Sequence, residues 1–290
     1  MAHERKVPVS ALNIAMHEPH SAAAYVDLLN GLYQKKKIVD IRSLTGLLIG
    51  SMHPIVRLSP ERGITGEIYK FTNLDQSEPW FDVNTLEEAT EEDARSIKIP
   101  DNLKPHLARF TYIFFPHGHR MYVQTRNKSR SLSITSTRKF LLALLDEPSV
   151  PSVPKVEITV VPHRDSISRI LQIKYLRKLH ISLVRPNPDD LGDAERRLLD
   201  RLANQGADKM DTVLHAKTNQ KLTPDGDMLT LARVAASNGS VFGSGRDEAN
   251  NPVRKSTVDQ PWVEVAHFDE DVQTEQEAIL QLVESIHRML

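Results

Sequence analysis

The chain has 290 residues, of which 40% are hydrophobic and 26% are charged, and its formal net charge is −1. This composition is typical of a globular protein with a sizeable core, and the absence of Cys excludes a disulfide framework, a zinc ribbon and a thiol nucleophile. No window approaches the roughly 18 apolar residues of a spanning helix, and the N-terminus lacks the apolar core of a signal peptide. We therefore expect a cytoplasmic protein that is not embedded in a membrane.

The first half of the chain alternates between helix and strand patterns. Ser21 is a suitable N-cap for a helix that carries Tyr25, Leu29 and Leu32 on one face. Apolar runs predict four strands, at residues 44–56, 66–72, 109–115 and 120–125. The last two form a hairpin whose turn is residues 116–119, and residues 135–145 form the next helix.

The stretch from Glu147 to Pro154 contains three prolines, which stop a helix and favour extended backbone. We place a domain boundary there. The prediction is an N-terminal α+β domain with a basic hairpin at residues 1–148 and a C-terminal α+β domain at residues 149–290. The alternative is an edge loop between two parts of one domain.

The second half continues the mixture of elements. Asn187 and Pro188 favour the start of a helix that Gly206 ends, and the last helix carries Ile279 and Val283 at helical spacing. The other predicted elements are strands at 156–160, 179–184 and 212–216, helices at 166–173 and 225–236, and a hairpin at 240–257. The predicted fold class is α+β, with mixed sheets, flanking helices and two subdomains.

Charge is strongly segregated along the chain. Residues 102–188 contain 15 Lys and Arg against four acidic residues, a local net charge of +11, which leaves −12 for the rest. Residues 75–101 contain nine acidic and two basic residues. A middle third this basic predicts an anionic partner. The alternative is that the acidic and basic segments pack together and cancel.

Motifs for chemistry are weak. His117 and His119 could share a metal, but no third ligand lies near them in sequence, and exposed turn histidines are the simpler interpretation. Asp225 and Asp227 could hold a metal, but they also suit a turn and a helix start. The chain has no phosphate-binding loop and no recognisable nucleophile frame. We expect no catalytic residue, no metal and no cofactor.

The basic segment is the strongest functional candidate, because Arg, Lys, Asn and Ser side chains are the groups that contact nucleic-acid phosphates. The expected primary contacts are Arg120, Arg126, Lys128, Arg130, Arg138 and Lys139. The expected secondary contacts are Lys174, Arg177, Lys178 and Arg185. Together they would line one cationic groove, which the acidic segment 75–101 could cover in a resting state. Low aromatic content favours duplex binding over a stacking platform for single strands.

Several stretches resemble a bacterial family catalogued as domain of unknown function family 4747. They are GEIYKFTNLD at 66–75 with WFD at 80–82, IKIPDNLKP at 97–105 and LHISLVRPNPDDLG at 179–192. The resemblance extends from ALNI at 11–14 to STVDQP at 256–261, and it implies no activity that could be transferred. The order of elements is also similar to that of the lambda exclusion protein RexA, a dimer that binds DNA without sequence preference. That similarity implies DNA binding and phage defence.

The main hypothesis is a non-enzymatic, sequence-tolerant nucleic-acid-binding protein, for duplex DNA rather than RNA, in a bacterial phage-defence or phage-exclusion system. We expect a homodimer, for which the amphipathic C-terminal helix is one candidate surface. Two alternatives stay open. One is a metal-dependent nuclease or toxin effector, and the other is a protein-interaction subunit of a defence complex.

Overall fold

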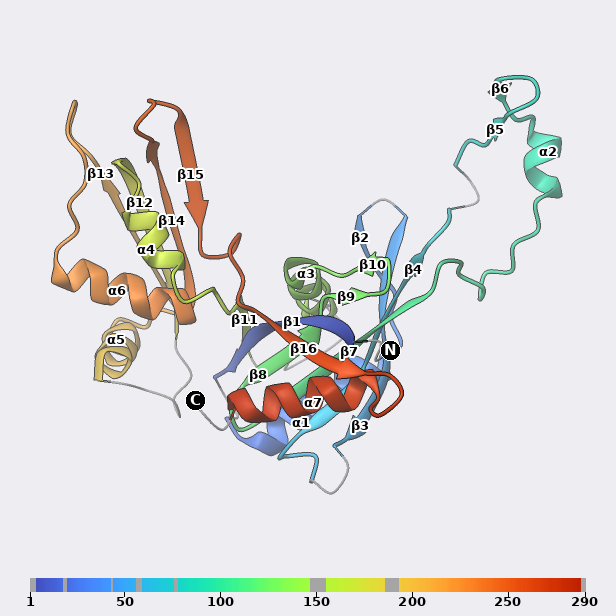
Figure 1. The fold of residues 1–290 in the computed structure, drawn as a ribbon, viewed down its shortest axis with the longest axis horizontal. Helices are drawn as coiled ribbons and strands as arrows, with labels where there is room; N and C mark the ends of the chain where they lie inside the picture. The colour runs from blue at the N-terminus through green and yellow to red at the C-terminus, as the bar shows by residue number, and fades with distance from the viewer. Residues whose placement is uncertain are drawn as a thin grey trace.

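The computed structural model describes residues 4–17, 20–42, 44–55, 59–75, 78–146, 155–185 and 193–287. Figure 1 shows two separate sheets with their helices and an arm that projects from the larger sheet. The larger sheet has the order β11-β1-β8-β7-β4-β3-β2, with β16 also paired to β1, and its pairs are antiparallel. Its strands are β1 (Glu4–Met16), β2 (Val39–Arg42), β3 (Thr45–Pro54), β4 (Ile64–Thr72), β7 (Ala108–Phe115), β8 (Arg120–Gln124), β11 (Val156–Val160) and β16 (Val263–Asp269).

Strand β1 is the centre of this sheet and was absent from the elements expected from the sequence. It pairs with β8 along one edge, and along the other edge with β16 through its first half and β11 through its second half. Both faces of β1 are covered, so its residues form one long buried run without clear alternation. Residues 4–16 therefore lack the alternation of apolar and polar residues that would predict a strand, although the large sheet is built around this strand.

Helices cover both faces of the large sheet. α1 (Ala22–Gln34) and α3 (Ile134–Leu145) pack on one face, in a core that includes Tyr25, Phe110 and Phe140. α7 (Glu275–His287) packs on the other face, where Ile279 and Val283 meet Ile113 and Phe115. α1 begins where the sequence predicts, because the Ser21 side chain accepts a hydrogen bond from Ala24 N at 3.2 Å.

The small sheet has the order β13-β12-β14-β15 and its own core. Its strands are β12 (Tyr175–Val184), β13 (Lys209–His215), β14 (Gly239–Arg246) and β15 (Pro252–Ser256), and its helices are α4 (Ser166–Leu171), α5 (Asp193–Asn204) and α6 (Gly226–Ser237). Leu179, Ile181 and Leu183 of β12 are buried under the helices. Strand β12 includes the strand predicted at 179–184, and its residues alternate in burial because one face is covered by the helices.

An arm joins β4 to β7 and carries β5 (Phe81–Asp82), β6 (Glu87–Glu88) and α2 (Glu91–Ser96). Figure 1 shows that it projects away from the small sheet. It therefore does not cover the basic residues of the small sheet, contrary to the resting state expected from the sequence. Phe81, Val83 and Leu86 are 63%, 72% and 73% exposed, so the arm has little core of its own.

The α+β fold class is confirmed, and most helices and hairpins lie where the sequence predicts them. The division at residues 148 and 149 stays a prediction, and the large sheet takes strands from both sides of it, because β11 and β16 pair with β1. The predicted linker at 147–154 and the N-cap at Asn187 lie outside the described residues. Within the described ranges, no helix is long and apolar enough to cross a membrane.

Candidate nucleic-acid interface

A small basic hairpin follows β8 and is built from β9 (Arg126–Asn127) and β10 (Arg130–Ser131). Lys128 lies in its turn with a φ of 51°, the left-handed conformation that closes tight turns. Asn127 Nδ2 donates to Arg109 O at 2.7 Å, and this bond fixes the hairpin against β7. Arg126, Lys128 and Arg130 are all exposed. The hairpin thus presents three cations from a backbone that is tied to the large sheet.

Cations from two further strands of the large sheet join the hairpin. Lys70 of β4 donates to Ser131 O at 2.7 Å, which places its ammonium group against β10, and Arg42 of β2 is close enough to affect the Lys70 charge. Arg109 of β7 is opposite Tyr69 in the register, with its guanidinium carbon 5.6 Å from the ring centroid, and so projects from the other face of the sheet. We call the set on the hairpin side the hairpin cluster, and its members are Arg42, Lys70, Arg126, Lys128 and Arg130.

The hairpin cluster is not neutralised by carboxylates. Among the residues that the structure describes, none of its five members forms an ion pair. Burial lowers the pKa of Lys70, and the charges of Arg130 and Arg42 lower it further. Like charges are therefore close enough to affect one another, which favours an anion at this surface.

The remaining primary candidates lie elsewhere. Arg138 of α3 donates from Nε to Ile158 O at 2.6 Å, and this hydrogen bond ties the helix to β11. Burial lowers the pKa of Arg138. Lys139 is exposed on the same helix. Arg120 is half-buried and projects from the same face of β8 as Tyr122, toward α7 rather than toward α3.

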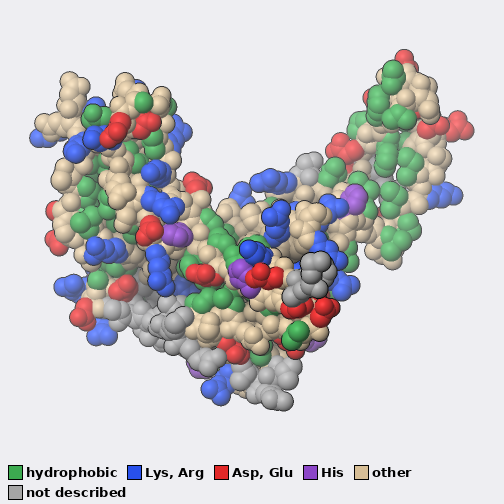
Figure 2. Space-filling view, viewed as in Figure 1, with side chains coloured by type: hydrophobic (Ala, Val, Ile, Leu, Met, Phe, Trp, Pro, Cys, Tyr) green, Lys and Arg blue, Asp and Glu red, His purple; other side chains and the backbone are tan. Residues whose placement is uncertain are grey.

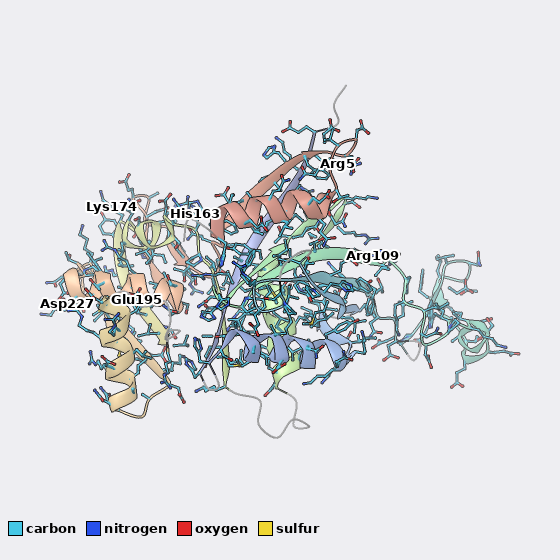
Figure 3. All side chains as sticks on the ribbon, turned by 90° about the horizontal axis from the view of Figure 1, so that it is seen from below. Arg5, Arg109, His163, Lys174, Glu195 and Asp227 are labelled. Carbon is cyan, nitrogen blue, oxygen red and sulfur yellow. The ribbon has the colours of Figure 1, made fainter. Side chains whose placement is uncertain are left out.

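The secondary candidates belong to the small-sheet part. Lys174 forms an ion pair with Glu248 at 3.3 Å, and Arg177 donates from one nitrogen to Gln220 O at 2.7 Å and to Lys217 O at 3.3 Å. Lys178 is half-buried on β12, and Arg185 follows that strand. Figure 3 shows Lys174 and Arg109 on different parts of the molecule. The structure therefore places the primary and secondary candidates on two parts of the molecule with a hollow between them, and one continuous groove stays a prediction.

Lys and Arg side chains nevertheless face the hollow from both sides, as Figure 2 shows. The structure thus concentrates Arg126, Lys128 and Arg130 at one site and adds neighbours that sequence proximity could not reveal. Lys70 and Arg42 come from strands more than fifty residues before the hairpin, and only the pairing of the sheet brings them there. In the sequence, the one feature that could have marked Lys70 as a contact is its place between Tyr69 and Phe71 in a predicted strand.

The histidine and carboxylate motifs have structural roles. Residues 116–119 form the predicted turn, but only His117 is exposed, whereas His119 is 3% exposed and lies 4.8 Å from the ring of Tyr25. The Asp225 side chain accepts a hydrogen bond from Met228 N at 2.9 Å and caps α6. Over the described ranges, no group of three or more His, Cys, Asp or Glu residues could hold a metal ion.

A family model described as a domain of unknown function, DUF4747, matches residues 5–284. The chain belongs to the DUF4747 family. The resemblance inferred from the sequence is confirmed over nearly the whole chain. No curated protein matches this DUF4747 chain, and the similarity to the lambda exclusion protein RexA stays a prediction.

The match to DUF4747 runs through the large sheet, the arm and the small sheet alike. The hairpin cluster lies within the matched residues, and so does the hollow between the sheets. The description of the DUF4747 family assigns no activity, so any role for this surface has to be argued from its geometry and charge.

Proposed function

We propose that this DUF4747 chain binds nucleic acid through the phosphate backbone, with the hairpin cluster as the primary contact. The supporting observation is that five cations gather around one anchored hairpin and none has a carboxylate partner in the described structure. Each phosphate that a Lys or Arg neutralises releases condensed counterions, which is the main source of sequence-independent affinity.

Duplex DNA is the proposed substrate. The exposed side chains of the hairpin are Arg, Lys and Ser, which suit phosphate contacts that position a protein without reading bases. The ring contact between Arg109 and Tyr69 lies on the other face of the sheet, so stacking of unpaired bases at the hairpin cluster has little support. The proposed activity is binding without catalysis.

The proposal also includes a biological setting. We propose that the protein acts in the cytoplasm as a homodimer in a bacterial phage-defence or phage-exclusion system. This biological setting rests on the order of elements, which is similar to that of the lambda exclusion protein RexA, and not on the hairpin cluster. A protein-interaction subunit, in which the same cations meet an acidic partner chain, is the alternative that the following experiment distinguishes.

The test is fluorescence anisotropy with two labelled duplexes of unrelated sequence, across a salt series from about 50 to 300 mM. Both duplexes should bind with similar affinity. Changing Arg126, Lys128 and Arg130 together to Gln should weaken binding by about tenfold or more at 100 mM salt, and it should reduce the log–log salt slope by about 2–3. Single-stranded DNA and RNA of the same length give the preference between nucleic acids.

The matched control removes three exposed cations from α5, at Arg196, Arg197 and Arg201, and so loses the same charge far from the hairpin. It should weaken binding by less than about threefold, because only the long-range field changes. Absence of binding at 50 mM salt would reject the proposal and favour the protein-interaction alternative. Equal losses in both triple variants would reject the hairpin cluster as the contact.

A further inference from the structure

A pocket of about 340 Å³ lies where the small-sheet part meets the large sheet. One wall comes from β1, β8 and α7, and the other comes from α4, α6 and the segment between β11 and α4. Figure 3 shows His163 of that segment beside one end of α7, between the two parts. The volume falls within the range of about 300–1,000 Å³ that is usual for small-molecule sites.

The lining of the pocket is cationic. It contains Arg120, Arg164, Arg233 and His163, and no Asp or Glu contributes to it among the described residues. Arg164 and Arg233 are exposed and form no ion pair in the described structure. Guanidinium groups present planar sets of donors that match phosphate oxygens. The charge and geometry of these groups favour a phosphorylated ligand.

A buried hydroxyl provides an independent indication of a ligand. Tyr122 lines the pocket and is 2% exposed, and its Oη atom has no hydrogen-bond partner among the described residues. A buried polar atom without a partner lowers stability, so such atoms are rare and call for an explanation. Burial raises the pKa of Tyr122, with Arg120 opposing it, so the hydroxyl is protonated at neutral pH and can donate.

The rest of the lining suits a flat ring. Trp262 and Tyr122 meet edge to face, with ring centroids 5.9 Å apart and planes at 69°. Val161, Pro162 and Ile167 add apolar surface. Aromatic and apolar walls beside arginines are the combination that accommodates a nucleobase while its phosphate is bound.

We propose that this pocket binds a free nucleoside monophosphate, with Arg233, Arg164 and Arg120 around the phosphate and Trp262 beside the base. The Tyr122 hydroxyl donates to a polar atom of the nucleotide. The pocket is separate from the hairpin cluster, so the proposal does not depend on DNA binding. A terminal nucleotide of a nucleic-acid chain has the same chemistry, and the experiment separates the two sources.

The test is calorimetric titration of the full chain with AMP, GMP, CMP and UMP, and with adenosine and inorganic phosphate as partial ligands. At least one monophosphate should bind with a dissociation constant below about 1 mM, and adenosine and phosphate should each bind about tenfold more weakly or worse. Equal binding of adenosine and AMP would overturn the proposal. So would the absence of binding by all four monophosphates at about 5 mM, which is beyond the expected range.

Two variants separate a binding role from a structural one. R233Q removes an exposed charge, and Y122F removes only a hydroxyl without a partner, so neither should impair folding. R233Q should lower affinity by about tenfold and Y122F by about three- to tenfold, with the melting temperature of Y122F unchanged or higher. R126Q in the hairpin is the control and should bind nucleotide as the unmodified chain does.

Unchanged affinity in both R233Q and Y122F would overturn the assignment to this pocket. Titration with a 5′-phosphorylated trinucleotide distinguishes a free nucleotide from the terminal nucleotide of a nucleic-acid chain. It should bind no more tightly than the best monophosphate, because the proposed ligand fills the pocket. Markedly tighter binding of the trinucleotide would overturn the free nucleotide as the ligand.

Discussion

His17 directly follows β1, and its pKa depends on its surroundings in the folded protein. Both of its ring nitrogens are buried and have no hydrogen-bond partner among the described residues. Burial is the main cause that lowers its pKa to about 4; Arg185, Lys155 and His20 lower it further, and Asp208 opposes them. His17 is thus neutral in the folded protein at pH values where an unfolded chain would already bind a proton.

Because the folded-state pKa of His17 is the lower one, acidification should destabilise the protein. Above pH 6.5 both states are neutral, and between pH 6.5 and about 4 only the unfolded chain gains the proton. The expected loss in the free energy of unfolding between pH 7 and pH 5 is on the order of 1 kcal/mol, after allowance for partial solvent screening. Urea unfolding at both pH values should show a smaller loss in His17→Gln than in the unmodified chain. His215→Gln, at an exposed histidine, is the control, and equal losses in all three proteins would contradict the prediction.

At the scale of elements, the arm is an insertion between two strands that already pair. Lys70 of β4 is opposite Ala108 of β7, and Thr72 N donates to Pro105 O, so the two segments stay hydrogen-bonded at the base of the arm, with a shift of one residue from the register of the strands. Figure 2 shows hydrophobic and acidic side chains on the visible face of the arm. The arm therefore adds negative charge near the hairpin cluster without contributing to the core of the large sheet.

Replacing residues 73–105 with Asn-Gly should leave the large sheet folded, because β4 and β7 pair from Ile64 to Lys70 without the arm and a short turn can join them. We expect the melting temperature to change by less than about 4 °C, equivalent to about 1 kcal/mol or less. The affinity for duplex DNA at low salt should rise about two- to tenfold, since nine acidic but only three basic residues are lost, and the gain should shrink as salt increases. Unchanged or weaker DNA binding in the deletion variant would contradict this role of the arm.

At the scale of the whole molecule, the two sheets have separate cores, and we expect them to unfold as separate units. The small-sheet core contains Ile181 and the large-sheet core contains Ile113, and both side chains are at most 1% exposed. Truncating either isoleucine to Ala should cost about 2–5 kcal/mol. In hydrogen exchange, Ile181→Ala should accelerate the amides of β12 and β14 by about 30-fold or more while β7 and β8 change little, and Ile113→Ala should give the reverse pattern. Uniform acceleration across both sheets would show a single cooperative unit.

Elements with local signals could be predicted from the sequence, and elements defined by long-range pairing could not. The helix capped by Ser21, the turn at 116–119 and the alternation of β12 depend on neighbours in the chain. Strand β1 is buried on both faces. In β16, Val263 and Val265 lie on one face and the buried Ala266 and Phe268 lie on the other, so neither strand carries a single alternating pattern that distinguishes it. The same limit applies to the candidate site, where Arg126, Lys128 and Arg130 lie within five residues of one another but Lys70 and Arg42 are distant in sequence.

The sequence alone determined the α+β class, the family, and the segregation of charge into a basic middle and an acidic arm, because composition and local periodicity are properties of short stretches. The tertiary structure decided which cations share a surface. Antiparallel pairing places Lys70 and Arg42 beside the basic hairpin, while it sends Arg120 to the opposite face of the sheet and Lys174 to another part of the molecule. It also decided that Tyr122 and Trp262 meet beside arginines from the large sheet and from the small-sheet part, since a pocket between two parts exists only once both are folded.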